Sequence, residues 1–201
     1  MRTEHIQKLF EDSISVKKEM LDGNYFEIIA DMGDVIVESI KNGGKLLLCG
    51  NGGSAADAQH LAAELLIRLR PNNNRQGLPA IALAQDTSTI TACANDFGYE
   101  VLFERMVETI GNQGDVIIGI TTSGKSENVN LALVAAKKIG IKAFGFLGCG
   151  GGDSAFLCDQ SLIIPSKDTG RIQESHITAG HALMEYIEDN LINDGFISLR
   201  D

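Results

Sequence analysis

The stretch KLLLCGNGGSAADAQHLAAELL, residues 45–66, decides the fold. It joins an unbroken apolar run of strand length, through a glycine turn, to an Ala-rich segment of strong helix formers. A glycine turn between a buried strand and the N-terminus of a helix presents backbone N–H groups that can bind an anion. We therefore expect a site for a phosphorylated or oxyanionic small molecule beside this turn.

Apolar runs of the same kind recur along the rest of the chain. They cover residues 45–49, 79–84, 115–120, 141–147 and 161–164; helical patterns separate them at 54–69, 87–94, 99–111, 126–139 and 153–157, and a long one follows at 171–194. Runs that are apolar throughout, rather than alternating, indicate a parallel sheet covered by helices on both faces. Ligands of such sheets bind outside the carboxyl ends of the strands, so a site is expected among the loops that follow them.

Two further helical patterns precede the first strand, at residues 3–21 and 25–42, and the second stops at Gly43 and Gly44. Glycine just past the last periodic residue is a typical helix end. We predict one domain over residues 1–201. It consists of an N-terminal helical pair in residues 1–43 and, in residues 44–201, a three-layer α/β core of about five parallel strands with a C-terminal helix.

The composition argues against several classes of partner. A hydrophobic content of 44% and a charged content of 22% are typical of a soluble globular protein. The net charge of −10 argues against nucleic-acid binding, although a local pocket can still hold a phosphate. No segment approaches the ~20 apolar residues of a membrane span. The four cysteines show no CxxC spacing, so we expect buried free thiols in a cytoplasmic protein.

The segment Thr121-Thr122-Ser123-Gly124-Lys125-Ser126 follows the central apolar run and precedes a helix. Its four hydroxyls surround one glycine, so hydroxyl and backbone N–H donors converge, which suits a phosphate monoester. The alternative is an ordinary turn with Ser126 as the helix N-cap. The position after a central strand favours the phosphate interpretation. The segment does not match GxxxxGK[ST], which argues against nucleotide hydrolysis.

His60 and Glu64 project from one face of a predicted helix, one turn apart. Such a pair can share a divalent metal, act as acid and base, or form a surface ion pair, and spacing alone favours the surface pair. The C-terminal helix shifts the balance, because Gln173 and His181 lie two turns apart on one side of it. Gly180 beside His181 is costly in a helix interior and indicates close packing there.

Other polar residues are less informative. Asn95 and Asp96 are ordinary turn residues that could equally bind sugar hydroxyls, and the turn interpretation is the simpler. His176 is rotated away from Gln173 and His181, which favours a structural or interface role. Arg171 is able to neutralise a carboxylate or contact a ligand, and its alternative is a surface charge in the first turn of a helix.

Four motifs occur in order: GNGGSAADAQHLAAEL, ANDFGYE, GDVIIGITTSGKS and RIQESHITAGH. Together they resemble the sugar-isomerase (SIS) domain family and, more closely, its bacterial phosphoheptose isomerases, over roughly residues 5–195. The resemblance implies a flavodoxin-like five-stranded parallel sheet. It also implies a homotetramer whose active sites are shared between subunits. Gly170 departs from the pattern, since relatives vary before Arg171, and any side-chain contact from that position is lost.

The resemblance also implies roles for individual residues. Phosphate would be held by Ser54, Thr121, Ser123 and Ser126; the rest of the substrate would meet Asn51, Gly52, Gly53, Glu64, Asn95, Asp96, Thr122 and Gln173. One zinc ion per site would be bound by His60, Glu64, Gln173 and His181. Glu64 and His181 would also carry out the proton transfers.

The implied reaction is an aldose–ketose isomerisation. It converts sedoheptulose 7-phosphate to D-glycero-D-manno-heptose 7-phosphate through an ene-diol, early in the synthesis of ADP-heptose for lipopolysaccharide. One alternative is an isomerase of another sugar phosphate. Another is a tetrameric SIS adaptor that binds a replication initiator protein. Such adaptors lose the ionisable residues at the positions of Glu64 and His181, whereas this chain keeps both.

Overall fold

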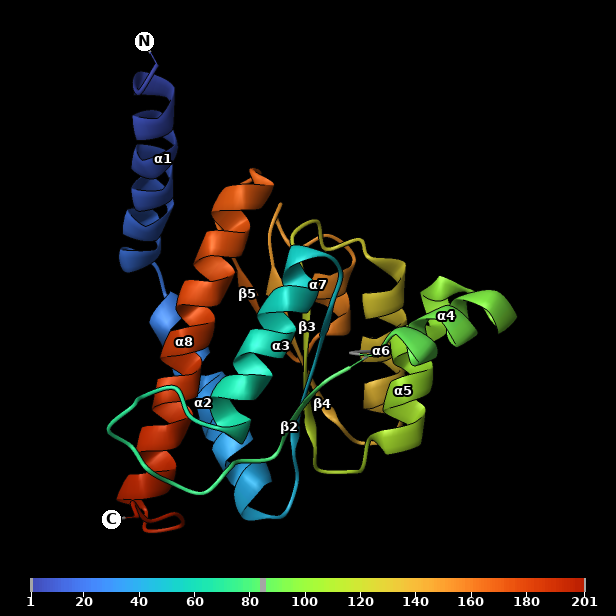
Figure 1. The fold of residues 1–201 in the computed structure, drawn as a ribbon. Coiled ribbons are helices and arrows are strands. Elements are labelled where there is room, and N and C mark those ends of the chain that lie inside the picture. The colour runs from blue at the N-terminus through green and yellow to red at the C-terminus, as the bar shows by residue number, and fades with distance from the viewer. Residues whose placement is uncertain (1, 84–85, 201) are drawn as a thin grey trace.

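Five strands form one parallel sheet in the computed structural model of the chain, which describes residues 2–83 and 86–200 (Figure 1). The strands are β1 Leu46–Gly50, β2 Ala80–Ala82, β3 Val116–Thr121, β4 Lys142–Leu147 and β5 Gln160–Ile163. Their order, β2-β1-β3-β4-β5, is that of flavodoxin-like sheets. The predicted three-layer α/β fold with a five-stranded parallel sheet is therefore confirmed.

Helices cover both faces of this sheet. They are α1 Glu4–Leu21, α2 Tyr25–Lys41, α3 Gly53–Leu66, α4 Thr87–Asp96, the 3₁₀ turn η1 Tyr99–Val101, α5 Leu102–Ile110, α6 Glu127–Lys138, α7 Ser154–Leu157 and α8 Thr169–Asn193. Alternate side chains of a strand point to opposite faces. Leu46 and Leu48 accordingly join a core with α2, α3 and α8, whereas Leu47 and Cys49 join a core with α5 and α6. Strands apolar throughout are thus needed to fill two cores.

Two predicted elements end two or three residues too late. The helix expected over residues 54–69 ends at Leu66, because the backbone N–H of Leu78 and the guanidinium of Arg75 bond the carbonyl oxygen of Leu65. The strand expected over residues 79–84 is shorter as β2, which ends at Ala82, and residue 84 lies outside the described residues.

The neighbouring strands β1 and β3 create the place where a ligand is expected. Gly50 at the end of β1 lies beside Ile120 near the end of β3. The chain then leaves β1 into α3 on one face of the sheet and leaves β3 into α6 on the other. In open α/β sheets, ligands bind in the crevice where neighbouring connections diverge in this way. The GNGGS turn and the Thr121–Ser126 loop therefore share one edge of the sheet.

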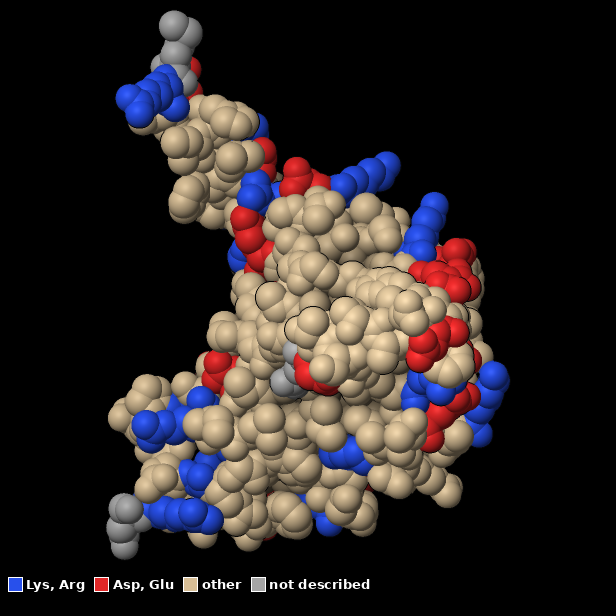
Figure 2. All heavy atoms as spheres, turned by 45° about the vertical axis from the view of Figure 1, so that its right-hand side comes forward, with Lys and Arg blue, Asp and Glu red and all other residues tan. Residues whose placement is uncertain are grey.

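The N-terminal part of helix α1 projects beyond the rest of the molecule (Figures 1 and 2), whereas its C-terminal part packs against the core through Val16 and Met20. The two N-terminal helices occur as predicted, but α1 extends outward instead of folding back along α2. Its apolar residues Ile6, Phe10 and Ile14 are 54%, 69% and 52% exposed. Large exposed apolar surfaces of this kind mark protein interfaces. Among residues 2–83 and 86–200, no helix has the length and hydropathy that crossing a bilayer requires.

The four cysteines are free thiols, as predicted, but they are not all buried. Cys49 and Cys93 are buried and Cys158 is half-buried, whereas Cys149 is exposed. Cys149 is exposed because it lies in the glycine-rich turn that follows β4, and β4 ends two residues earlier, at Leu147. Its φ of 51° is that of a turn residue.

His176 connects α8 to the sheet and makes stability depend on pH. The side chain is 1% exposed, and its Nε2 donates to the carbonyl oxygen of Leu147, 3.0 Å away. Burial lowers the pKa of His176 from 6.5 to about 4. Between pH 6.5 and 4, His176 binds a proton in the unfolded chain but not in the folded chain. The free energy of unfolding therefore falls as the pH drops from 6.5 towards 4.

We expect His176→Gln to flatten this dependence, because the Gln amide can still donate to Leu147 but does not titrate. The wild type should lose about 3 kcal/mol of unfolding free energy through this group across that window. Urea unfolding at pH 7, 6, 5 and 4 measures the difference between the two proteins. Parallel pH curves for wild type and variant would contradict the assignment.

Candidate active site

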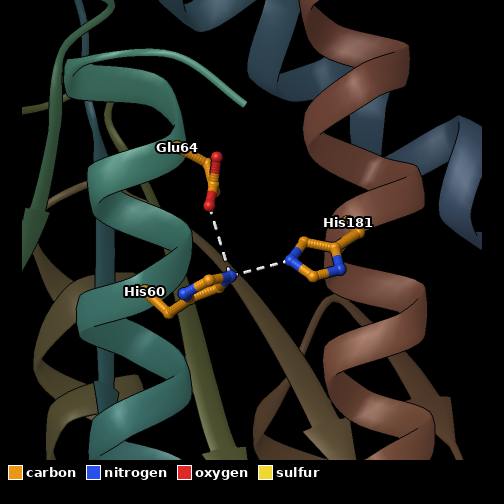
Figure 3. Close-up of side chains that lie close together, drawn as sticks. All are labelled: His60, Glu64 and His181. Carbon is orange, nitrogen blue, oxygen red and sulfur yellow. Dashed lines mark hydrogen bonds and ion pairs between the residues drawn. The ribbon is translucent and has the colours of Figure 1, made fainter. Parts of the chain in front are cut away.

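Three ionisable side chains meet between α3 and α8 (Figure 3). His60 and Glu64 come from α3 and His181 comes from α8. Nε2 of His60 lies 2.8 Å from Nε2 of His181 and 3.2 Å from Oε1 of Glu64. The spacing-based alternative of an isolated surface pair is wrong, because a third group from the far end of the chain joins the pair.

The packing of two parallel helices brings these groups together. Gly180 of α8 faces Leu61 of α3, and a Cβ at Gly180 would lie 2.7 Å from the Leu61 side chain. Gly53, at the start of α3, likewise touches Gln173 of α8. The contacts run in the same direction along both helices, so α3 and α8 are parallel. The close packing predicted at Gly180 is present, and it holds His181 opposite His60.

Of the four residues expected to bind a metal, Gln173 lies outside the group that His60, Glu64 and His181 form. Its carboxamide lies against Gly53, where a Cβ would meet Nε2 at 2.6 Å. Gly53 precedes His60 by seven residues, which is about 10 Å along the helix. The structure therefore places the Gln173 carboxamide towards the GNGGS turn, beside the group formed by His60, Glu64 and His181.

The donor chemistry of this group fits a zinc ion. Two imidazole nitrogens and one carboxylate oxygen lie within 4.8 Å of one another. Two His and one Glu form a common ligand set of catalytic zinc, which leaves a further position for water or substrate. The His60 side chain is 48% exposed and that of Glu64 is 14% exposed, so a ligand can reach the group from solvent.

The hydroxyls of the Thr121–Ser126 loop converge. Oγ1 of Thr121 lies 2.8 Å from Oγ of Ser126 and 3.4 Å from Oγ of Ser123. Ser126 occupies the N-cap position of α6, but its side chain makes no capping hydrogen bond. The alternative interpretation of a simple capped turn therefore fails, since the hydroxyl that would cap α6 points to Thr121. Ser54 lies buried in the first turn of α3, after the adjacent strand.

Gly124 allows this loop to form. Its φ is +65°, and a Cβ there would lie 2.0 Å from the carbonyl oxygen of Gly151 in the turn after β4. The Gly124 carbonyl oxygen in turn accepts from the backbone N–H of Ser154. Two loops that follow neighbouring strands are thus packed backbone to backbone, which fixes the position of the hydroxyls.

Asn51 is tied to two residues that sequence reasoning missed. Its side-chain amide exchanges hydrogen bonds of 2.8 and 2.9 Å with that of Asn128, and Tyr99 donates to its Oδ1 at 2.8 Å. Asn128 also accepts from the backbone N–H of Val129, so it caps α6 in place of Ser126. Tyr99 was present in the ANDFGYE motif, whereas no pattern singled out Asn128. The network joins the turn after β1 to the helix after β3.

Asn95 and Asp96 lie apart from the other candidates. Both are exposed in the last turn of α4, where Nδ2 of Asn95 donates to Asp96 at 2.7 Å. Helix α4 lies on the opposite side of the molecule from α8 (Figure 1). Arg171 neutralises a carboxylate, since its Nε donates to Glu174 at 2.8 Å.

Comparison with known proteins gives consistent matches. The family model described as SIS domain matches residues 10–148. A phosphoheptose isomerase of Clostridium acetobutylicum is 48% identical over 190 residues, which cover 94% of this chain and 96% of the relative. A phosphoheptose isomerase of Paramagnetospirillum magneticum is 59% identical over 152 residues, 76% of this chain and 78% of the relative.

Solved structures match to a similar extent. A phosphoheptose isomerase from Neisseria gonorrhoeae has a TM-score of 0.88 at 38% identity, covering 94% of this chain and 100% of that chain. One from Francisella tularensis has a TM-score of 0.89 at 36% identity, covering 94% and 99%. These similarities extend over nearly the whole chain and include both α3 and α8.

Proposed function

Because this chain belongs to the SIS domain family, we propose that it is an aldose–ketose isomerase that converts sedoheptulose 7-phosphate to D-glycero-D-manno-heptose 7-phosphate. The observation that carries the proposal is the meeting of His60, Glu64 and His181 between α3 and α8. A proton acceptor, imidazoles and a loop lined with hydroxyls are the groups that isomerisation of a sugar phosphate needs. The product would supply ADP-heptose for lipopolysaccharide synthesis in the cytoplasm.

The chemistry transfers one proton between two carbons. Glu64 removes a proton from C1 of the open-chain ketose while the C2 carbonyl oxygen takes up a proton, which gives the ene-diol. Loss of the proton from the C1 oxygen and return of the carbon-bound proton to C2 complete the aldose. His181 is the proposed carrier of the oxygen-bound proton, and it would also assist ring opening. Histidine suits this role because imidazole exchanges protons near neutral pH.

The phosphate and the sugar chain have separate proposed contacts. The hydroxyls of Ser54, Thr121, Ser123 and Ser126 would donate to the phosphate, supported by the helix N-termini that follow the two loops. Asn51, Gly52, Gly53 and Thr122 would line the sugar chain. This division leaves Glu64 and Gln173 for the reacting end of the substrate.

Zinc is the proposed cofactor, one ion per site, held by His60, Glu64 and His181, and Gln173 would have to turn its carboxamide away from Gly53 to join them as the fourth ligand. The fit rests on the two imidazole nitrogens and the carboxylate oxygen that converge within 4.8 Å of one another. When bound, zinc would polarise the carbonyl group of the substrate.

A homotetramer with shared active sites is supported by two features. The apolar face of α1 is exposed in the single chain, and so are Asn95 and Asp96, the two residues that the resemblance places against the substrate. We expect light scattering to give the mass of a tetramer. Phe10→Asp, which places a charge on a 69% exposed apolar position, should shift the mass downward. A wild-type monomer would contradict the proposal.

Incubation with sedoheptulose 7-phosphate, with and without added zinc, tests the activity. Separation of ketose and aldose phosphates measures turnover, a panel of six- and seven-carbon ketose phosphates measures chain-length preference, and metal analysis gives the zinc content. A seven-carbon aldose phosphate is the expected product. If none forms after zinc addition, the non-catalytic adaptor becomes the better assignment, and turnover of only a six-carbon substrate would identify another isomerase.

A further inference from the structure

A buried ion pair lies beside the end of α3. The side chains of Arg75 and Glu188 are each 1% exposed, and Nε of Arg75 donates to Oε1 of Glu188 at 2.5 Å. Arg75 belongs to the loop between α3 and β2, and Glu188 belongs to α8. The pair therefore connects this loop to α8.

The other nitrogens of Arg75 hold the last turn of α3. Its two terminal nitrogens donate to the carbonyl oxygens of Glu64 and Leu65, each at 2.9 Å. Because α3 ends at Leu66, these carbonyl oxygens lack partners within the helix. Arg75 thus caps the helix from outside, and one of the two groups that it bonds is the backbone of Glu64.

Glu188 lies on the same side of α8 as His181. The two are seven residues apart, which is close to two turns of helix. The second carboxylate oxygen of Glu188 accepts from Nε of Arg70 at 2.7 Å and from Asn73 at 2.8 Å. Burial would raise the pKa of Glu188, but the hydrogen bonds from Arg75, Asn73 and Arg70 outweigh it and hold the pKa below its usual value. The carboxylate stays charged and fully bonded.

We infer that Arg75 and Glu188, together called the clamp, are positioning residues for the reaction. The clamp fixes the backbone of Glu64 relative to the helix that carries His181, and so sets the carboxylate opposite the imidazoles. This inference rests on the proposed isomerase function. It assigns a role to residues that do not touch the reacting groups with their own side chains.

A contribution to the stability of the fold does not by itself explain why Arg75 and Glu188 form a buried ion pair here. A buried ion pair pays for its desolvation, and apolar residues of similar volume often replace such a pair without loss of stability. An apolar pair, however, cannot donate to the carbonyl oxygens of Glu64 and Leu65. The two roles therefore predict different outcomes for the same substitution.

Two variants of the full-length protein separate them. Arg75→Lys keeps the positive charge but cannot bond Glu188 and both carbonyl oxygens together. The double variant Arg75→Met with Glu188→Leu removes the ion pair and leaves Arg70, which is 29% exposed, able to turn to solvent. We expect kcat to fall about 10-fold in the first and about 100-fold in the second, with KM within about threefold, because small misplacements of catalytic groups act on kcat.

Lys45→Met is the matched control. Lys45 bonds the buried carboxylate of Asp115 at 2.6 Å, just before β1 and β3 begin, and it bonds neither Arg75 nor Glu188. This variant should lower the unfolding midpoint and leave kcat unchanged. Unchanged kcat in both clamp variants, or an equal fall of kcat in the control at matched folded fraction, would overturn the inference.

Hydrogen exchange gives a readout that does not depend on activity. Amide protons in the last turn of α3 should exchange about 10-fold faster in Arg75→Lys than in the wild type, and at the wild-type rate in Lys45→Met. If the wild type fails to isomerise any sugar phosphate, the proposed function is wrong, and these exchange rates still decide whether Arg75 holds α3. Wild-type exchange in Arg75→Lys would refute the clamp even in an active enzyme.

Discussion

Glu64→Gln is expected to lower kcat by about 10³-fold while KM stays within about threefold of the wild type, because general-base catalysis supplies factors of this size. Gln has nearly the same shape as Glu but cannot accept the carbon-bound proton. The side chain lies 3.2 Å from His60 and is largely sheltered between α3 and α8, so the amide should occupy the same position. Binding of the phosphate, which uses other residues, should persist.

Steady-state kinetics and exchange of the substrate C1 proton with solvent measure this effect. Proton exchange should stop together with turnover, since both need the same base. Glu108→Gln, at an exposed position on α5, is the control that makes the same chemical change away from the site. A Glu64→Gln protein with more than a tenth of wild-type kcat would assign the base to another residue.

Gly124→Ala is expected to lower kcat/KM about 100-fold, as misplacement of substrate-binding groups by about an ångström can. The added Cβ would lie 2.0 Å from the backbone oxygen of Gly151, and because the atoms that it meets are all backbone atoms, no side chain can move aside to make room. The positive φ of 65° adds strain of about 1 kcal/mol for an L-residue. The loop must shift, and the hydroxyl groups of Thr121, Ser123 and Ser126 then no longer converge.

Gly43→Ala provides the comparison for Gly124→Ala. Gly43 has a φ of +83°, yet nothing lies within 4 Å of the added Cβ, so this variant carries the strain without the collision. It should lose about 1 kcal/mol of stability and keep its kinetics. Inhibition by inorganic phosphate should weaken in Gly124→Ala and stay unchanged in Gly43→Ala. Equal kinetics in the two variants would show that the loop does not bind the phosphate.

The sheet could be predicted because each strand carries its own signal. The run at residues 46–50 must be apolar on both sides to fill two cores, and this requirement is visible without knowing any partner. The end of α3 carries no such local signal. Its carbonyl oxygens are bonded by Arg75, eleven residues beyond Glu64, so the helix that its residues favour to position 69 stops at Leu66.

The site was predictable only in part for the same reason. His60 and Glu64 share a helix face, and that pairing follows from spacing. The arrival of His181 depends on how α8 packs, for which Gly180 was the one local sign. The placement of Gln173 against Gly53, and the pairing of Asn51 with Asn128, depend on side-chain packing between distant segments, which periodicity does not encode.

The parallel packing of α3 and α8 has a consequence for biosynthesis. His60 and His181 are 121 positions apart, so at 5–20 residues per second a ribosome makes them about 6 to 24 s apart. By the end of that interval the last strand, β5, has been made, while the face of α3 that later meets α8 has stayed uncovered throughout. Leu61, which packs on Gly180 in the finished protein, is then available to chaperones or to other chains. The group formed by His60, Glu64 and His181 is thus assembled only after all five strands have been translated.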